Sequence, residues 1–76
     1  MFKKAYPNLA WWVENQGWIE IGEDLQSDSW IRILDEGGMC WEDEGSSSLD
    51  EALLEADKWL AEEIEDRFKK VPPKKY

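Results

Sequence analysis

The fold of this chain is decided by residues 48–69, which read SLDEALLEADKWLAEEIEDRFK. Ser48 and Glu51 have the spacing of a capping box, in which the Ser48 hydroxyl accepts a hydrogen bond from the Glu51 N–H and the Glu51 carboxylate reaches back to the Ser48 N–H. Apolar residues then recur at helical spacing and share one face: Leu49, Ala52, Leu53, Ala56, Trp59, Leu60, Ile64 and Phe68. The opposite side is acidic. We therefore predict an amphipathic helix from about Leu49 to Lys69.

Ahead of this helix the hydrophobic period changes to two, which is typical of β-strands. Strands are predicted at Trp18–Ile21 and at Trp30–Leu34. The isoleucines that are predicted to face the helix are Ile19, Ile21, Ile31 and Ile33. The side chains that would then lie on the outer face of the sheet include Trp18, Trp30, Arg32 and Leu34.

A third strand is predicted at Met39–Glu42, directly after the turn DEGG at residues 35–38. The two glycines of that turn can adopt positive φ angles, which tight hairpin turns require. Met39 and Trp41 alternate with Cys40 and Glu42, so only one of these two pairs can face the helix. We predict that Met39 and Trp41 face it.

The segment LAWWV at residues 9–13 is compatible with a fourth, edge strand or, because Pro7 and Asn8 precede it, with a helical turn. The predicted fold is therefore α+β: a three- or four-stranded antiparallel meander with one C-terminal amphipathic helix packed on one face. We expect residues 9–69 to form the single domain, with an N-terminal extension at 1–8. Residues 70–76 contain two prolines and three lysines and are expected to form a basic flexible tail.

The chain has 76 residues, and a chain of this size buries only about 60% of the surface that its unfolded form exposes. Its single cysteine excludes an internal disulfide, and the absence of histidine removes the common zinc-binding patterns. Association with another subunit remains as a source of stability. The N-terminal sequence lacks a signal-peptide pattern and no apolar run reaches the roughly 20 residues of a membrane span, so we expect a cytoplasmic protein.

Charge is distributed unevenly along the chain. All 18 acidic residues lie within residues 5–68, together with only three of the nine basic residues, so this body has a balance of −15 although the whole chain carries −9. Such a body repels phosphate backbones, which argues against nucleic-acid binding by the folded part. The partner that we expect is a protein, either a second copy of the chain or a basic protein.

Catalytic chemistry has little support in the sequence. Without histidine, a serine or cysteine nucleophile lacks its usual base, and Cys40 beside Trp41 is expected to be an inert, packed thiol. A small hydrolase that uses the turn carboxylates, such as Asp35 and Glu42, remains as an alternative, but paired carboxylates need a deep cleft for this chemistry. No run of acids follows the calcium-loop pattern. We expect neither an enzyme nor a cofactor or metal.

Tryptophan is the most unusual feature of the predicted strand region, with five indoles at Trp11, Trp12, Trp18, Trp30 and Trp41. Five indoles on short strands cannot all face one helix. Some of them are expected to line a surface for partner binding, and we assign this surface to Trp18, Trp30, Arg32 and Leu34 on the outer face, since tryptophan and arginine are enriched at binding hot spots. The alternative is that the N-terminal segment covers one or two of these indoles through Trp11 or Trp12.

The stretch DEGGMCWEDEGSSSLDEALLEADKWLAEEI, at residues 35–64, resembles short uncharacterised acidic proteins of cyanobacterial type. More distantly, strands followed by a capped helix with Ser48, Glu51, Ala52 and Leu53 resemble the β-β-β-α domain of HicB-like antitoxins. That likeness implies binding to a small basic ribonuclease. The function that we expect is thus a non-enzymatic protein-interaction module that can self-associate through its aromatic sheet face, with an antitoxin-type inhibitor as the alternative.

Overall fold

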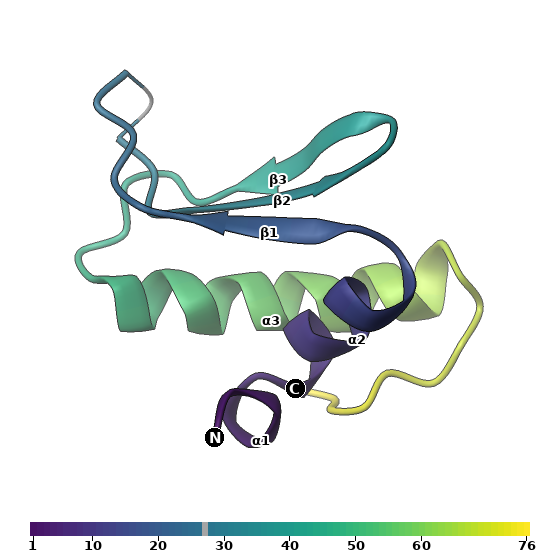
Figure 1. Cartoon of the computed structure of the whole chain (residues 1–76). Coiled ribbons are helices and arrows are strands. Elements are labelled where there is room, and N and C mark those ends of the chain that lie inside the picture. Colours follow the sequence, from purple (N-terminus) through teal and green to yellow (C-terminus); the bar gives the residue numbers. More distant parts are fainter. Residues whose placement is uncertain (27) are drawn as a thin grey trace.

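The residues that the structure describes, 1–26 and 28–76, form a sheet of three strands with a long helix across one of its faces (Figure 1). In this computed structural model, the strands β1 (Trp18–Ile21), β2 (Ile31–Asp35) and β3 (Gly38–Glu42) pair antiparallel in the order β1-β2-β3. The helix α3 (Leu49–Asp66) runs along the face that we call the inner face; the outer face points away from it. The predicted α+β meander with a C-terminal helix is confirmed.

The start of α3 is set by local sequence. The Ser48 Oγ accepts the N–H of Glu51 at 3.2 Å, as the capping box predicts, while the Glu51 carboxylate accepts a hydrogen bond from the Ser47 hydroxyl. The predicted apolar face is confirmed by the fully buried side chains of Ala52, Ala56, Leu60 and Ile64. Against them lie the isoleucines of β2, Ile31 and Ile33, which are also fully buried.

The end of α3 comes at Asp66, earlier than the predicted Lys69. Lys69 has a φ of 57°, which belongs to the left-handed region and cannot continue a helix. The next N–H, that of Lys70, donates to the Ile64 carbonyl oxygen at 3.1 Å and satisfies one of the last helical acceptors. The chain therefore reverses here and returns along the helices.

The N-terminal segment is helical, with α1 at Phe2–Ala5 and α2 at Pro7–Asn15. Residues 9–13 belong to α2, so the edge-strand alternative is wrong and the helical alternative is correct. Pro7 occupies the first turn, where its missing N–H has no helical partner to lose and its fixed φ suits a helix. Leu9 and Trp12 of α2 are fully buried within the core that α3 and the sheet share.

A carboxylate from α3 caps the N-terminus of α2. Asp57 is fully buried, and its Oδ1 accepts the N–H groups of Asn8 at 2.8 Å and Leu9 at 3.0 Å. These first-turn donors have no acceptor within their own helix. An acidic side chain at this end also interacts favourably with the positive end of the helix dipole. Asp57 thus replaces the side-chain cap that Tyr6, at the N-cap position of α2, does not supply.

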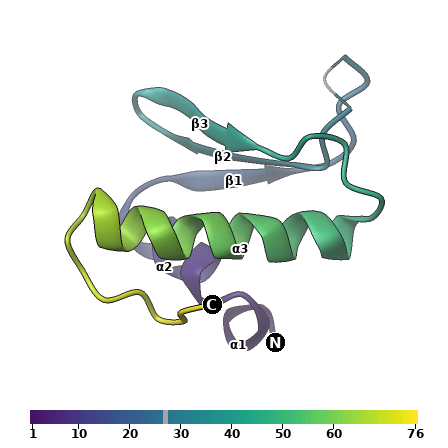
Figure 2. The same cartoon turned by 180° about the vertical axis from the view of Figure 1, so that it is seen from behind.

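The C-terminal residues 70–76 turn back along α3 (Figure 2) and are bonded to both α2 and α3. The side chain of Asn8 bonds both backbone groups of Lys74: its Nδ2 donates to the Lys74 carbonyl oxygen at 2.9 Å and its Oδ1 accepts the Lys74 N–H at 3.1 Å. The Tyr76 hydroxyl donates to the Asp57 carboxylate. Residues 70–76 are thus held by hydrogen bonds, which differs from the predicted flexible tail. The predicted boundary after residue 8 falls inside α2. Local patterns could not reveal either feature, because the bonds that hold both ends join segments far apart in sequence.

A bulge in β3 changes which side chains face outward. Trp41 pairs with Ile33 and Met39 pairs with Leu34, so Cys40 is an extra residue between two paired positions. Trp41 faces inward as predicted, but the prediction for Met39 is wrong: it lies on the outer face with 55% of its surface exposed. The inserted residue shifts the alternation of the strand by one position, which moves one of the two side chains to the other face.

Most of the indoles are used by the core. Trp12 is fully buried and its N–H donates to a carbonyl oxygen of β2 at 2.9 Å. Trp41 stacks on Trp59 with ring centroids 6.1 Å apart, and Trp11 meets the edge of Phe68 at 5.5 Å. Because α2 supplies a second helix to pack against, the molecule buries more tryptophan than one helix and one sheet face would allow.

Candidate functional site

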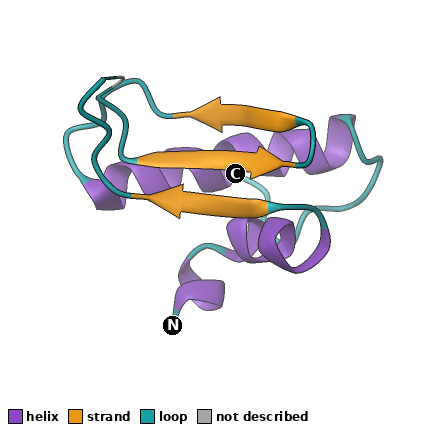
Figure 3. Ribbon diagram, turned by 45° about the horizontal axis from the view of Figure 1, so that its top comes forward, coloured by secondary structure: helices purple, strands orange, loops and turns teal. Residues whose placement is uncertain are grey.

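Figure 3 views the three strands from the side of the outer face, with α3 behind them. Two rows of side chains run across all three strands on this face. Strand pairing aligns Trp18 with Leu34 and Leu34 with Met39, and these three residues are here named the apolar row. The next outward-facing positions align Glu20 with Arg32 and Arg32 with Glu42, and these are named the charged row. The face is therefore divided into an apolar end, near the β2–β3 turn, and a charged end.

The apolar row is open to solvent at both of its ends. Trp18 is 44% exposed on β1 and Met39 is 55% exposed on β3, while Leu34 between them is partly buried. Antiparallel sheets commonly leave one face to water, but that face is then mostly polar. A row that spans the sheet with a tryptophan and a methionine at its ends is the pattern of a contact surface.

Met39 is the residue of this surface that sequence reasoning missed. A signal for it exists in the length of the turn: with Glu36 and Gly37 as a two-residue loop, Asp35 pairs with Gly38 and the next pair is Leu34 with Met39. Counting back from the turn would have placed Met39 beside Leu34 on the outer face.

Arg32 is held by its own chain at the charged end. Its Nε lies 3.4 Å from the Glu20 carboxylate, its Nη1 donates to the Ser29 hydroxyl at 2.9 Å, and its Nη2 donates to the Gly22 carbonyl oxygen at 3.1 Å. Its side chain is only 15% exposed. Arg32 therefore presents a positive charge in a fixed position between the two carboxylates of its row.

Trp30 does not lie with the other predicted contact residues. It precedes β2, its indole N–H donates to the Ser46 carbonyl oxygen at 2.7 Å, and its ring packs against the core. The backbone is held there by the buried Asp43, which accepts the N–H groups of Trp30 at 2.7 Å and Ile31 at 2.8 Å. Trp30 thus closes one end of the core, whereas Trp18, Arg32 and Leu34 are brought together as predicted.

The pKa of Asp43 reflects this role. Burial of the carboxyl group opposes ionisation, but hydrogen bonds from the N–H groups of Ile31, Ser46 and Trp30 outweigh burial and lower the pKa below its usual value of 3.8. Asp43 therefore remains a carboxylate at neutral pH. Its two oxygens are occupied by backbone donors, since the Ser46 N–H also donates to it at 3.2 Å.

The two carboxylates considered for a hydrolase are separated in the structure. Asp35 pairs with Gly38 at the turn, whereas Glu42 pairs with Arg32 at the other end of the hairpin. The pKa of Asp35 is lowered, first by a hydrogen bond from Gln16 and then by the Gly37 N–H and the nearby Arg67. The carboxylate of Asp35 therefore stabilises the turn, and its lowered pKa makes it a poor proton donor.

Burial raises the pKa of the Cys40 thiol, and the negative charge of Asp35 raises it further. These two effects outweigh the hydrogen bond and positive charge of Arg67, which lower that pKa. A thiol with a raised pKa is a weak nucleophile at neutral pH. This agrees with the packed position of Cys40 against the core.

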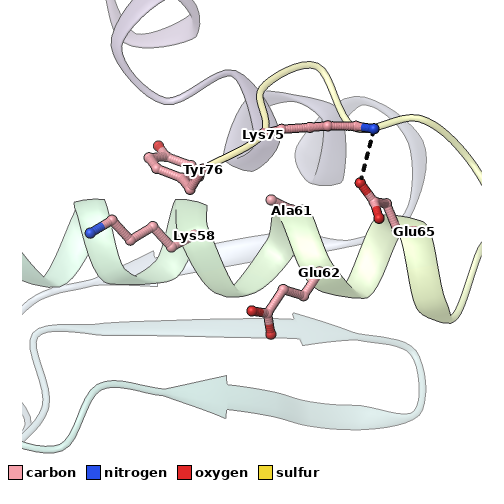
Figure 4. A pocket seen from close by; sticks show the side chains of 6 residues that line it. All are labelled: Lys58, Ala61, Glu62, Glu65, Lys75 and Tyr76. Carbon is pink, nitrogen blue, oxygen red and sulfur yellow. Dashed lines mark ion pairs between the residues drawn. The ribbon is translucent and has the colours of Figure 1, made fainter.

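A shallow groove of about 290 Å³ lies where the C-terminal residues cross α3, on the side of the helix away from the sheet (Figure 4). It is lined by Lys58, Ala61, Glu62, Glu65, Lys75 and Tyr76. Lys75 and Glu65 pair with each other across it at 3.5 Å. The groove holds mixed charges that partly neutralise one another and is a weaker candidate than the outer face.

In the part of the chain that the structure describes, neither a metal cluster nor a membrane-spanning helix suggests a function, and similarity to known proteins suggests none either. Within residues 1–26 and 28–76, no group of three histidine, cysteine or acidic side chains is placed to hold a metal ion. In the same residues, no helix is both long and apolar enough to cross a membrane. Comparison of the chain with protein-family models, curated proteins and solved structures finds no match. The function is therefore inferred from the site itself.

Proposed function

We propose that this chain is a non-enzymatic protein-interaction module and that the outer face of its sheet is the contact surface. The observation that carries the proposal is the apolar row, in which Trp18 and Met39 are about half exposed on either side of Leu34. Their apolar surface is large enough to favour contact with a partner, and tryptophan is enriched among hot-spot residues. The lone thiol of Cys40 supports the cytoplasm as the compartment.

Affinity capture with matched variants tests this proposal. Met39→Glu places a charge at one end of the apolar row, at a position that is already 55% exposed, so the fold should tolerate it. Leu25→Glu makes the same chemical change at a residue that is 90% exposed in the loop before β2 and serves as the control. Proteins that bind the wild type and Leu25→Glu but not Met39→Glu would support the proposal. Partners that all three proteins retain equally would rule out the outer face as the contact surface.

An antitoxin-type inhibitor is a second candidate, favoured by the charge of α3. The helix exposes a line of carboxylates to solvent on its side away from the core, at Asp50, Glu51, Glu55, Glu62 and Asp66. Such a surface attracts a basic protein, as a small ribonuclease would be. Copurification with a small basic protein encoded next to this chain, and loss of that complex at high salt, would support it. Failure to copurify at low salt would argue against it.

A further inference from the structure

Given the contact surface proposed above, the order of the side chains on the outer face selects the partner that fits it. The chain carries a net charge of −9, so two copies repel each other at long range. The apolar row contains no ionisable side chain, and the charged row beside it contains Arg32 as well as two acids. Self-association at this face therefore meets less local repulsion than it would at the acidic surface of α3.

One two-fold arrangement of two such faces is disfavoured by charge. Identical chains associate most simply about a two-fold axis, with the same patch on each copy. An axis parallel to the strands would place Arg32 against the partner's Arg32 and Glu20 against the partner's Glu42. Like charges placed directly opposite each other destabilise an interface.

An axis that runs along the apolar row, perpendicular to the strands, has the opposite consequence. It places the apolar row of one copy on the apolar row of the other. It also brings the position two residues before Leu34, on β2, opposite the partner's position two residues after Leu34, at the start of the β2–β3 turn. These positions are Arg32 and Glu36. Each Arg32 then lies across from the partner's Glu36, an exposed residue of the β2–β3 turn, and symmetry forms this contact twice.

We propose that the occupant of the outer face is a second copy of this chain, related by a two-fold axis along the apolar row, with Arg32 opposite the partner's Glu36. The packed faces are small, because each strand contributes only four or five residues. Stable interfaces bury about 800 Å² per partner, and this one is smaller, so the dimer is reversible and forms at micromolar concentrations or above.

The effect of salt on association distinguishes this dimer from a complex with a basic partner. The Debye length falls from about 30 Å at 0.01 M to about 8 Å at 0.15 M ionic strength. Two bodies of like net charge then repel each other less, so the dimer strengthens as salt is raised over this range. A complex between the acidic chain and a basic protein weakens over the same range.

Sedimentation equilibrium of the full chain, up to millimolar concentration and at both ionic strengths, measures the effect. Met39→Glu is expected to weaken the dimer at least tenfold, and the control Leu25→Glu to leave it within about twofold. Glu36→Arg is expected to weaken it about tenfold, since two attractive contacts become repulsive. Asp66→Arg, at the exposed end of α3, makes the same change in net charge away from the interface and should strengthen the dimer slightly. Far-UV circular dichroism confirms that each variant is folded.

The outcomes are distinct. A chain that stays monomeric at millimolar concentration at both ionic strengths overturns the inference, while the proposed function stands if capture of another protein still depends on Met39. A dimer that is insensitive to Met39→Glu uses another surface and also overturns it. A dimer that Glu36→Arg strengthens as much as Asp66→Arg does overturns the two-fold arrangement. Weakening by both Met39→Glu and Glu36→Arg, with both controls as expected, supports it.

Discussion

Removal of the Asp57 carboxylate should destabilise the protein more than any other change to an acidic residue of α3. Asp57 is fully buried and accepts hydrogen bonds from the N–H groups of Asn8 and Leu9, from the Asn8 side chain at 3.3 Å and from the Tyr76 hydroxyl. Asp57→Ala removes the acceptor of all four donors at once. It therefore acts on α2, α3 and the C-terminal segment together.

The magnitude follows from the donors that lose their partner. Loss of a helix cap costs about 1 kcal/mol, and leaving a buried donor unsatisfied costs about 1–3 kcal/mol. We expect Asp57→Ala to lower the free energy of unfolding by about 3 kcal/mol, out of a total of about 4–11 kcal/mol for a chain of this length. The corresponding fall in Tm is about 12–24 °C. Asp57→Asn keeps one acceptor oxygen and should cost about 1 kcal/mol.

Urea unfolding followed by tryptophan fluorescence and by far-UV circular dichroism provides the measurement. Asp66→Ala, an exposed residue of the same helix, is the control and should change the free energy of unfolding by no more than about 0.5 kcal/mol. Tyr76→Phe isolates the bond to the C-terminal segment and should cost about 1 kcal/mol. If Asp57→Ala were as stable as Asp66→Ala, the assignment of Asp57 as the cap of α2 would be refuted.

Three further changes test other parts of the fold. Gly17→Ala should lower the free energy of unfolding by about 3 kcal/mol, because its Cβ would lie 2.0 Å from the Leu34 backbone oxygen; an unchanged urea midpoint would contradict this close approach. Ser48→Ala should cost about 1 kcal/mol in the same assay, and no loss would mean that the cap of α3 is dispensable. The pKa of Asp43 is lower in the folded protein than its usual value of 3.8, so its carboxylate contributes fully to stability above pH 3.8. This contribution is lost as the pH falls through the pKa of the folded protein. Asp43→Asn should therefore flatten the acid-unfolding curve, and an equally steep curve would contradict this.

Local patterns in the sequence were sufficient for the elements whose contacts lie within one helix or one hairpin. The Ser48 cap depends on a donor three residues away, and the buried face of α3 follows from its own periodicity. The facing of β2 follows in the same way, since its alternating Ile31 and Ile33 are both fully buried on the inner face. For the candidate surface, this was enough to bring Trp18, Arg32 and Leu34 to one face.

Residues whose environment comes from distant segments could not be placed in this way. Trp30 alternates correctly for the outer face, but it precedes β2, and the Ser46 carbonyl oxygen and the core hold its indole elsewhere. Met39 was misplaced because the bulge at Cys40 separates its facing from that of Trp41. Beyond the bulge, Trp41 stacks on Trp59, a contact between a strand and a helix.

The sequence by itself determined the class of fold, the span of its strands and the start of its last helix, because hydrophobic period, turn residues and caps act over a few neighbouring positions. Only the tertiary structure decided that both chain ends belong to the folded body. Asn8, Asp57 and Tyr76 meet in one hydrogen-bonded group although they come from three separate segments. A lysine-rich end reads as flexible in sequence, because nothing near it in the chain reveals the buried carboxylate that its last residue contacts.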